Sequence, residues 1–177
     1  MEEYLKSYNL LYKFCKNKII LHCLTVSLKS YEIALKITFS EKYKKNKNIK
    51  LNLNNVVIGA LLHDIGRSIT HNISHGIEGA NILKKYNYNN EIINIVKVHI
   101  GAGIPKEEAI NLNLPYEDYL QNTLEEKIVA HSDNLSFGNY IVTIDKVIDK
   151  FKNRGASNTV INRIIKLNNE INYYLRE

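Results

Sequence analysis

Residues 56–67 read VVIGALLHDIGR, in which the uncharged run 56–62 is followed directly by an adjacent histidine and aspartate, His63 and Asp64. Burying a carboxylate behind such a run is costly unless a cation or a dense set of hydrogen bonds compensates it. The run predicts a helix at about residues 53–65 that carries a polar site at its end. We expect Gly66 to end this helix in the left-handed conformation of a C-terminal cap.

Helical periodicity continues on both sides of this segment. Apolar residues recur at three- and four-residue spacing, no convincing alternating strand is present, and Pro105 and Pro115 are the two prolines of the chain. Thr123 and Glu126 form a capping box, and Gly155 separates the last two helices. The expected fold is all-α, a compact helical bundle, with helices at about 3–16, 18–40, 53–65, 75–87, 89–99, 105–111, 122–136, 139–153 and 157–175.

Length and composition favour one domain. The chain has 177 residues, of which 45% are hydrophobic, so we expect a single domain over residues 1–177. Its motif-bearing core should cover about residues 20–140, with the C-terminal helices, 139–175, packed on it. The longest apolar runs are far shorter than the roughly 20 residues that span a bilayer, which predicts a cytoplasmic protein without a membrane anchor.

Charge and cysteine usage add little about partners. The formal net charge of +6 is compatible with nucleic acid, with a small phosphorylated substrate or with neither, so nucleic acid is possible but not favoured. The lysine-rich run 41–50 reads as a solvated loop. Cys15 and Cys23 lie eight residues apart in what reads as one helix, too far apart to bridge, and we expect reduced thiols.

Two further polar residues share faces with apolar neighbours. His22 follows Ile19 by three residues, and Asp133 follows Val129 by four, so both side chains should point inward. A single inward histidine is more often a hydrogen-bonded core residue than a ligand. Together with His63 and Asp64, however, these residues form the donor set of a divalent metal site, and imidazole with carboxylate suits iron, manganese, zinc or nickel better than calcium.

The order His22, His63-Asp64, Asp133 resembles the signature of the HD superfamily of metal-dependent phosphohydrolases, and residues 61–67 closely resemble its central motif. The resemblance covers about residues 20–140. It implies a helical bundle in which these four residues bind one divalent metal ion that activates water for attack on phosphorus. It further implies that Asp64 orients or deprotonates this water.

A second group is similar to that of HD subfamilies with two metals. In those, a histidine before a Gly-Ala pair and another at a later helix end bind the second ion, and the aspartate equivalent to Asp64 bridges. His75 precedes Gly79-Ala80 and His99 ends a predicted helix, so both are expected as ligands or as residues lining the site. Ile100 stands where some of these subfamilies carry a further histidine, which leaves the number of ions at one or two.

Arg67 and His71 are the expected substrate-binding residues. Arg67 can offer a planar fork of donors to a phosphate and so assist catalysis, although a surface arginine after a helix end would look the same. His71 lies in the polar segment that follows. His131 precedes Asp133 by two positions, which turns it about 200° away on a helix, so we do not expect a ligand there.

These residues favour a metal-dependent phosphohydrolase. The expected substrate is a phosphomonoester or phosphodiester of a nucleotide-like small molecule, cyclic phosphates included. The alternative is a nucleotide- or RNA-binding regulatory module with an HD fold and little turnover, which the basic charge and Ile100 support.

Overall fold

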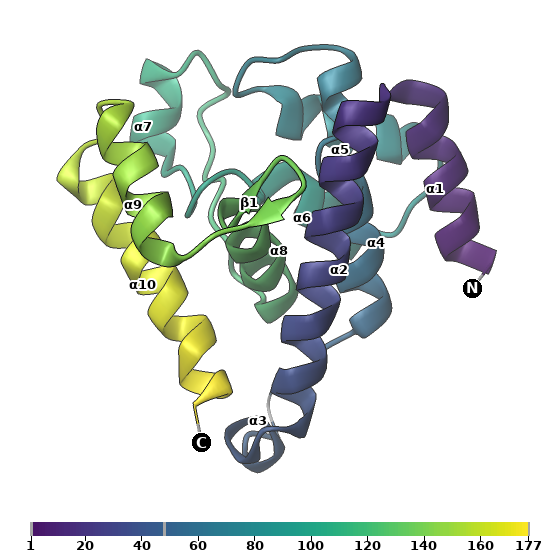
Figure 1. Ribbon diagram of the computed structural model, residues 1–177. Helices are drawn as coiled ribbons and strands as arrows, with labels where there is room; N and C mark the ends of the chain where they lie inside the picture. Colours follow the sequence, from purple (N-terminus) through teal and green to yellow (C-terminus); the bar gives the residue numbers. More distant parts are fainter. Residues whose placement is uncertain (1, 48, 177) are drawn as a thin grey trace.

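The structure is a computed structural model that describes residues 2–47 and 49–176, most of them helical (Figure 1). The elements in chain order are α1 (Glu2–Phe14), α2 (Asn17–Phe39), α3 (Glu41–Lys45), α4 (Leu53–Leu62), the 3₁₀ helix η1 (Ile65–Ser68), α5 (His75–Lys85), α6 (Asn90–Val98), α7 (Lys106–Asn111), α8 (Leu124–Asn134), β1 (Ser136–Phe137), β2 (Tyr140–Ile141), α9 (Ile144–Asn153) and α10 (Asn158–Leu175). The expected all-α fold class is confirmed.

The short apolar helix α4 forms the centre of the bundle. Ile58, Leu61 and Leu62 have no exposed surface, and α2 packs along α4, with α1, α6 and α8 around it. Gly59 permits the approach of α6, because a Cβ there would lie 2.6 Å from Cγ2 of Ile95. Every residue of the last part of α4, from Ile58 to Leu62, is buried, so the residues that directly follow it are carried into the interior.

Gly66 has a different role from the one predicted. α4 ends at Leu62, and Gly66 lies within η1 outside the positive-φ region, so the expectation of a left-handed cap is wrong. A Cβ at Gly66 would lie 1.9 Å from the carbonyl oxygen of His75 and 2.5 Å from the amide nitrogen of Gly79. Glycine is therefore required here by the close packing of η1 on α5.

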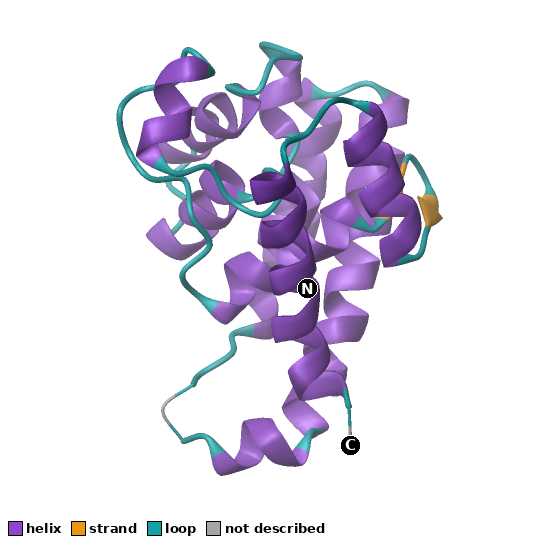
Figure 2. Ribbon diagram, turned by 90° about the vertical axis from the view of Figure 1, so that its left-hand side faces the viewer, coloured by secondary structure: helices purple, strands orange, loops and turns teal. Residues whose placement is uncertain are grey.

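A β-hairpin replaces the beginning of the helix predicted at 139–153. Ser136 pairs with Ile141 and Phe137 with Tyr140, and Gly138 makes the turn with φ 64°. Because this turn interrupts the helical pattern, α9 begins only at Ile144. The two short strands of the hairpin are drawn in orange in Figure 2. The capping box of Thr123 and Glu126 at the start of α8 is confirmed, and Gly155, with φ 77°, lies between α9 and α10 as expected.

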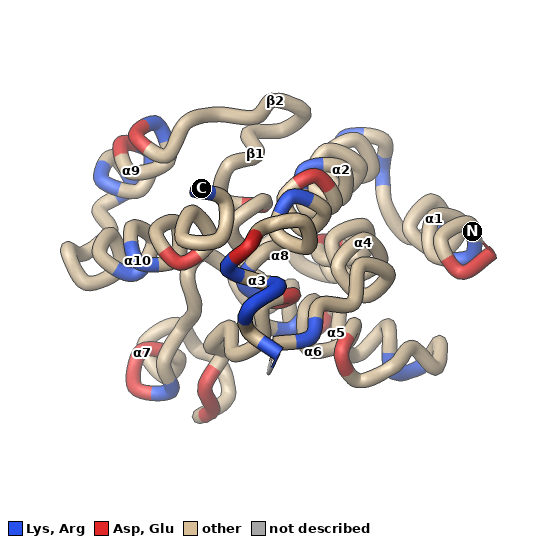
Figure 3. The backbone as a smooth tube through the Cα atoms, turned by 90° about the horizontal axis from the view of Figure 1, so that it is seen from below, with Lys and Arg blue, Asp and Glu red and all other residues tan. Residues whose placement is uncertain are grey.

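The lysine-rich run is partly helical, so the loop prediction is wrong for residues 41–45. The Ser40 hydroxyl accepts a hydrogen bond from the Tyr43 amide, which caps α3, and Glu41 lies in the first turn where the helix dipole favours acid. Lysines of this segment gather at one tip of the molecule (Figure 3). Residue 48 of the predicted loop lies outside the described residues.

The two cysteines do not share one helix. Cys15 lies in the junction after α1, whereas Cys23 lies within α2, and both are buried free thiols. Burial is the main reason that the pKa of the Cys15 thiol is raised to about 12. Over the described chain, every helix is too short or too polar to cross a bilayer.

Candidate metal centre

Three helices bring the first cluster together. His22 of α2, His63 at the end of α4 and Asp133 of α8 meet around one point: His22 Nε2 lies 3.0 Å from Asp133 Oδ1 and 3.3 Å from His63 Nε2. His63 Nε2 is 3.5 Å from the same Asp133 oxygen. Asp64 Oδ2 completes the group at 3.8 Å from Nε2 of each histidine. The structure thus brings together all four residues of the predicted mononuclear site.

A second cluster adjoins the first and shares Asp64 with it. His75 opens α5 and His99 follows α6, and their Nε2 atoms lie 3.2 Å apart. The other carboxylate oxygen of Asp64, Oδ1, is 3.1 Å from His75 Nε2 and 3.7 Å from His99 Nε2. Asp64 therefore faces one pair of histidines with each of its two oxygens.

All four histidines have the same tautomer because each Nδ1 meets a backbone carbonyl, which can only accept a hydrogen bond. The Nδ1 to oxygen distances are 3.0 Å for His22 to Gly138, 2.7 Å for His63 to Ala60, 2.7 Å for His75 to Asn72 and 2.7 Å for His99 to Val96. Nδ1 therefore carries the proton, and Nε2 of each neutral ring presents its lone pair to the cluster. Such outer partners hold metal-ligating imidazoles in orientation.

The donor set fits divalent cations. Within each cluster two Nε2 lone pairs face each other, an arrangement that is repulsive unless a proton or a cation lies between them. Asp64 Oδ1 is buried and makes no hydrogen bond, which is costly for a carboxylate oxygen without a cation. Three overlapping triads have ligand atoms within 4.8 Å of one another: His22, His63 and Asp64; His63, His99 and Asp133; Asp64, His75 and His99.

The charges of the cluster stabilise one another even though its members are buried. Burial opposes ionisation of Asp64, but the positive charge of His63, and after it the nearby imidazoles of His75 and His99, hold the pKa of its carboxyl well below the usual range. Burial likewise acts against charge on His63, yet the Asp64 carboxylate raises the His63 pKa well above its ordinary value. The carboxylates are therefore ready to act as anionic ligands at neutral pH.

A cavity of about 680 Å³ gives access to the first cluster. Arg67 lies on its wall and donates from Nε to Asp64 Oδ2 at 2.6 Å, which leaves its terminal nitrogens for other acceptors. His71 is exposed and also lines the cavity. A larger cavity of about 1070 Å³ lies between α8 and α10, and its lining includes none of the clustered residues.

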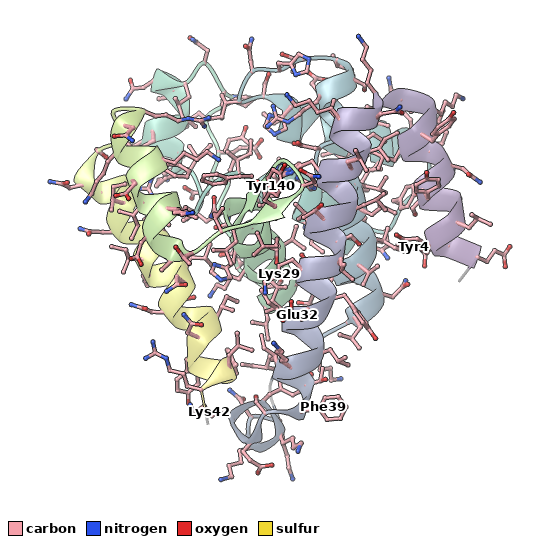
Figure 4. The ribbon with its side chains drawn as sticks, in the orientation of Figure 1. Tyr4, Lys29, Glu32, Phe39, Lys42 and Tyr140 are labelled. Atoms are coloured by element: carbon pink, nitrogen blue, oxygen red, sulfur yellow. The ribbon has the colours of Figure 1, made fainter. Side chains whose placement is uncertain are left out.

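His131 stays outside the clusters, as its position on the helix predicts. It is buried, and burial together with the ammonium of Lys29 lowers its pKa to about 4. Lys29 itself pairs with Glu32 on α2 at 3.0 Å (Figure 4).

Sequence reasoning missed three basic residues on the cavity wall, Lys18, Lys150 and Arg154. The spacing of Lys18, one helical turn before His22, was a signal that could have found the first of them. No sequence signal pointed to Lys150 and Arg154, because their position at the cavity depends on the direction in which the hairpin leads the chain into α9. The carbonyl of Gly138, which holds His22, depends on the same hairpin.

Comparison with known proteins found one family model and several related proteins. The family model described as HD domain matches residues 19–138. An uncharacterized protein of Methanocaldococcus jannaschii is 50% identical over 175 residues, which cover 98% of this chain and 99% of that protein. A protein of Picrophilus torridus named tRNA (cytidine(56)-2'-O)-methyltransferase is 50% identical over 116 residues, 66% of this chain but 34% of that protein. The chain thus spans about a third of this methyltransferase.

The HD domain of the Listeria monocytogenes phosphodiesterase PgpH, solved in complex with cyclic-di-AMP, has a similar fold. The TM-score is 0.55 at 18% sequence identity, and the match covers 97% of this chain and 98% of that one. At this identity the likeness shows the fold alone.

Proposed function

The chain belongs to the HD domain family, and from this membership we propose that it is a metal-dependent phosphohydrolase acting on a phosphomonoester or phosphodiester of a nucleotide-like small molecule. The observation that carries the proposal is the pair of histidine clusters joined by the two oxygens of Asp64. His22, His63, Asp64 and Asp133 would hold one ion, and Asp64, His75 and His99 a second. Iron or manganese fits this imidazole and carboxylate set, as do nickel and zinc.

Asp64, Arg67 and His71 have separate roles in the proposed reaction. A divalent ion, when bound, polarises a phosphate oxygen and makes hydroxide available from water near neutral pH. Asp64 would orient or deprotonate the attacking water. Arg67 holds the Asp64 carboxylate through Nε and presents its terminal nitrogens to the phosphate. It therefore contributes both to the orientation of Asp64 and to the binding of substrate. His71 donates to the substrate from the rim of the cavity.

A second candidate is a nucleotide- or RNA-binding module with little turnover. The net charge of +6 favours it, as does the relative that is named as a tRNA methyltransferase. This candidate predicts tight binding of nucleotide or RNA without hydrolysis under any of the metals that fit the site.

The test combines metal content with turnover. Purified protein loaded with manganese or iron should hydrolyse bis(p-nitrophenyl) phosphate or p-nitrophenyl phosphate. Asp64→Asn should lose bound metal and on the order of 100-fold or more of this activity, as expected for loss of a group that transfers a proton. His131→Gln is the matched control, because His131 is equally buried but lies outside the clusters. A metal-free protein, or an Asp64→Asn variant as active as the parent, would refute the proposal.

A further inference from the structure

The helix α9 contributes to the cavity from outside the segment that matches the family. That segment ends at residue 138, whereas α9 runs from Ile144 to Asn153. Lys150 and Phe151 of α9 line the cavity, as does Arg154 just after it. Because Lys150 and Arg154 are four residues apart, they lie on the same face of the helix end.

Lys150 is held in place at the cavity. Its ammonium lies 3.9 Å from the centroid of the Phe137 ring, a cation–π contact that fixes the end of an otherwise flexible side chain. The side chain is half-buried, and burial is the main reason that the pKa of its ammonium is lowered; Arg154 adds to this effect and the Asp133 carboxylate opposes it. An ammonium that is partly desolvated and held beside a candidate ligand is placed to bind an anion.

The charges around the cavity are unbalanced. Four basic residues line it: Lys18 on α2 one turn before His22, Arg67 on η1, Lys150 on α9 and Arg154 just after α9. Among the described residues that line the cavity, the acidic ones are Asp64 and Asp133, both candidate metal ligands. With ions bound, the cavity would carry more positive charge than the single negative charge of a phosphodiester can balance.

We propose that α9 is a substrate-binding element in which Lys150 and Arg154 bind a second anionic group, so that the substrate is a phosphate ester carrying a further phosphate. This inference rests on the proposed hydrolase function and narrows its substrate class to nucleotide-like compounds with at least two phosphates. Lys150 is the main contact because Phe137 fixes it, and the more exposed Arg154 adds to it.

A pair of chromogenic esters that differ only in the second phosphate tests the inference. The probes are the p-nitrophenyl ester of thymidine 5'-phosphate and the same ester with an additional 3'-phosphate. The parent protein should prefer the 3'-phosphorylated ester in kcat/KM by about 10- to 100-fold, the usual worth of a hydrogen bond to a charged group. Lys150→Met, which keeps the length of the side chain, should lose most of this preference, and Lys150→Arg should retain it.

Lys152→Met is the matched control. Lys152 belongs to the same helix but is exposed and does not line the cavity, so the preference should stay at the parent value. If the parent does not distinguish the two esters, or if Lys150→Met and Lys152→Met behave alike, the inference is overturned while the turnover itself upholds the hydrolase.

Binding gives a readout that is independent of turnover. Thymidine 3',5'-bisphosphate should bind the metal-free parent protein in a calorimetric titration, and Lys150→Met should weaken this binding about tenfold or more. If neither ester is hydrolysed, the hydrolase proposal fails, and this titration still decides the anion site: equal affinities for the parent and Lys150→Met would reject it.

Discussion

Replacing Gly66 with alanine should abolish metal binding at the second cluster, formed by Asp64, His75 and His99, and leave metal binding at the first. The new Cβ would lie 1.9 Å from the His75 carbonyl oxygen, whereas ordinary contact begins at 3.4 Å, so α5 must retreat from η1 by about 1.5 Å. Metal ligands tolerate deviations of only about 0.2 Å. The displacement therefore takes His75 out of range of an ion shared with Asp64, and overpacking should cost about 1–3 kcal/mol of stability.

The assay is elemental analysis of the metal-loaded protein together with thermal unfolding. The parent should bind two ions per chain and Gly66→Ala one, with a melting temperature lower by several degrees. Gly155→Ala is the control: its positive φ of 77° makes alanine strained, but nothing lies within 4 Å of the added atom. A Gly66→Ala protein that binds as many ions as Gly155→Ala, with equal affinity, would refute the reasoning.

Two further predictions concern stability. Burial, and after it the Lys29 ammonium, lower the pKa of His131 to about 4 in the folded chain. The contribution of the neutral His131 side chain to folding stability is therefore complete above about pH 6.5 and is lost as the pH falls from there toward 4. Between pH 7 and pH 5, urea denaturation should show the parent losing about 2 kcal/mol more than His131→Gln, and equal losses would contradict the assignment. Manganese at about 100 times its Kd should raise the free energy of unfolding by about 2.7 kcal/mol in calorimetry. Asp64→Asn should show no such rise, and an equal rise in both proteins would place the ion elsewhere.

The helical fold and the inward orientation of the candidate ligands could be predicted from local pattern, whereas their meeting at one site was implied by the resemblance to the HD superfamily. Helical spacing turns His22 and Asp133 inward, and the apolar run before His63 carries it into the core. The capping box at Thr123 is equally local. Residue type and spacing on single helices indicated His22, His63, Asp64 and Asp133, and the resemblance to the HD superfamily added His75 and His99. The structure brings these six residues together.

What the sequence could not reveal depends on contacts between distant elements. Gly66 looks like a helix cap until α5 is seen to pack on it. The carbonyl partners of the four Nδ1 atoms follow from the local course of the backbone, which residue type does not determine. Lys150 and Arg154 reach the cavity because the hairpin turns the chain there, and a single residue, Gly138, makes that turn.

The turn at Gly138 links two parts of the molecule mechanically. Its carbonyl oxygen accepts a hydrogen bond from Nδ1 of His22, and the chain that leaves the hairpin, beyond Tyr140 in Figure 4, leads directly into α9. A displacement of α9 would therefore be passed along this short connection to the peptide that orients the His22 imidazole. The position of α9 and the orientation of one candidate metal ligand are thus linked through a single glycine.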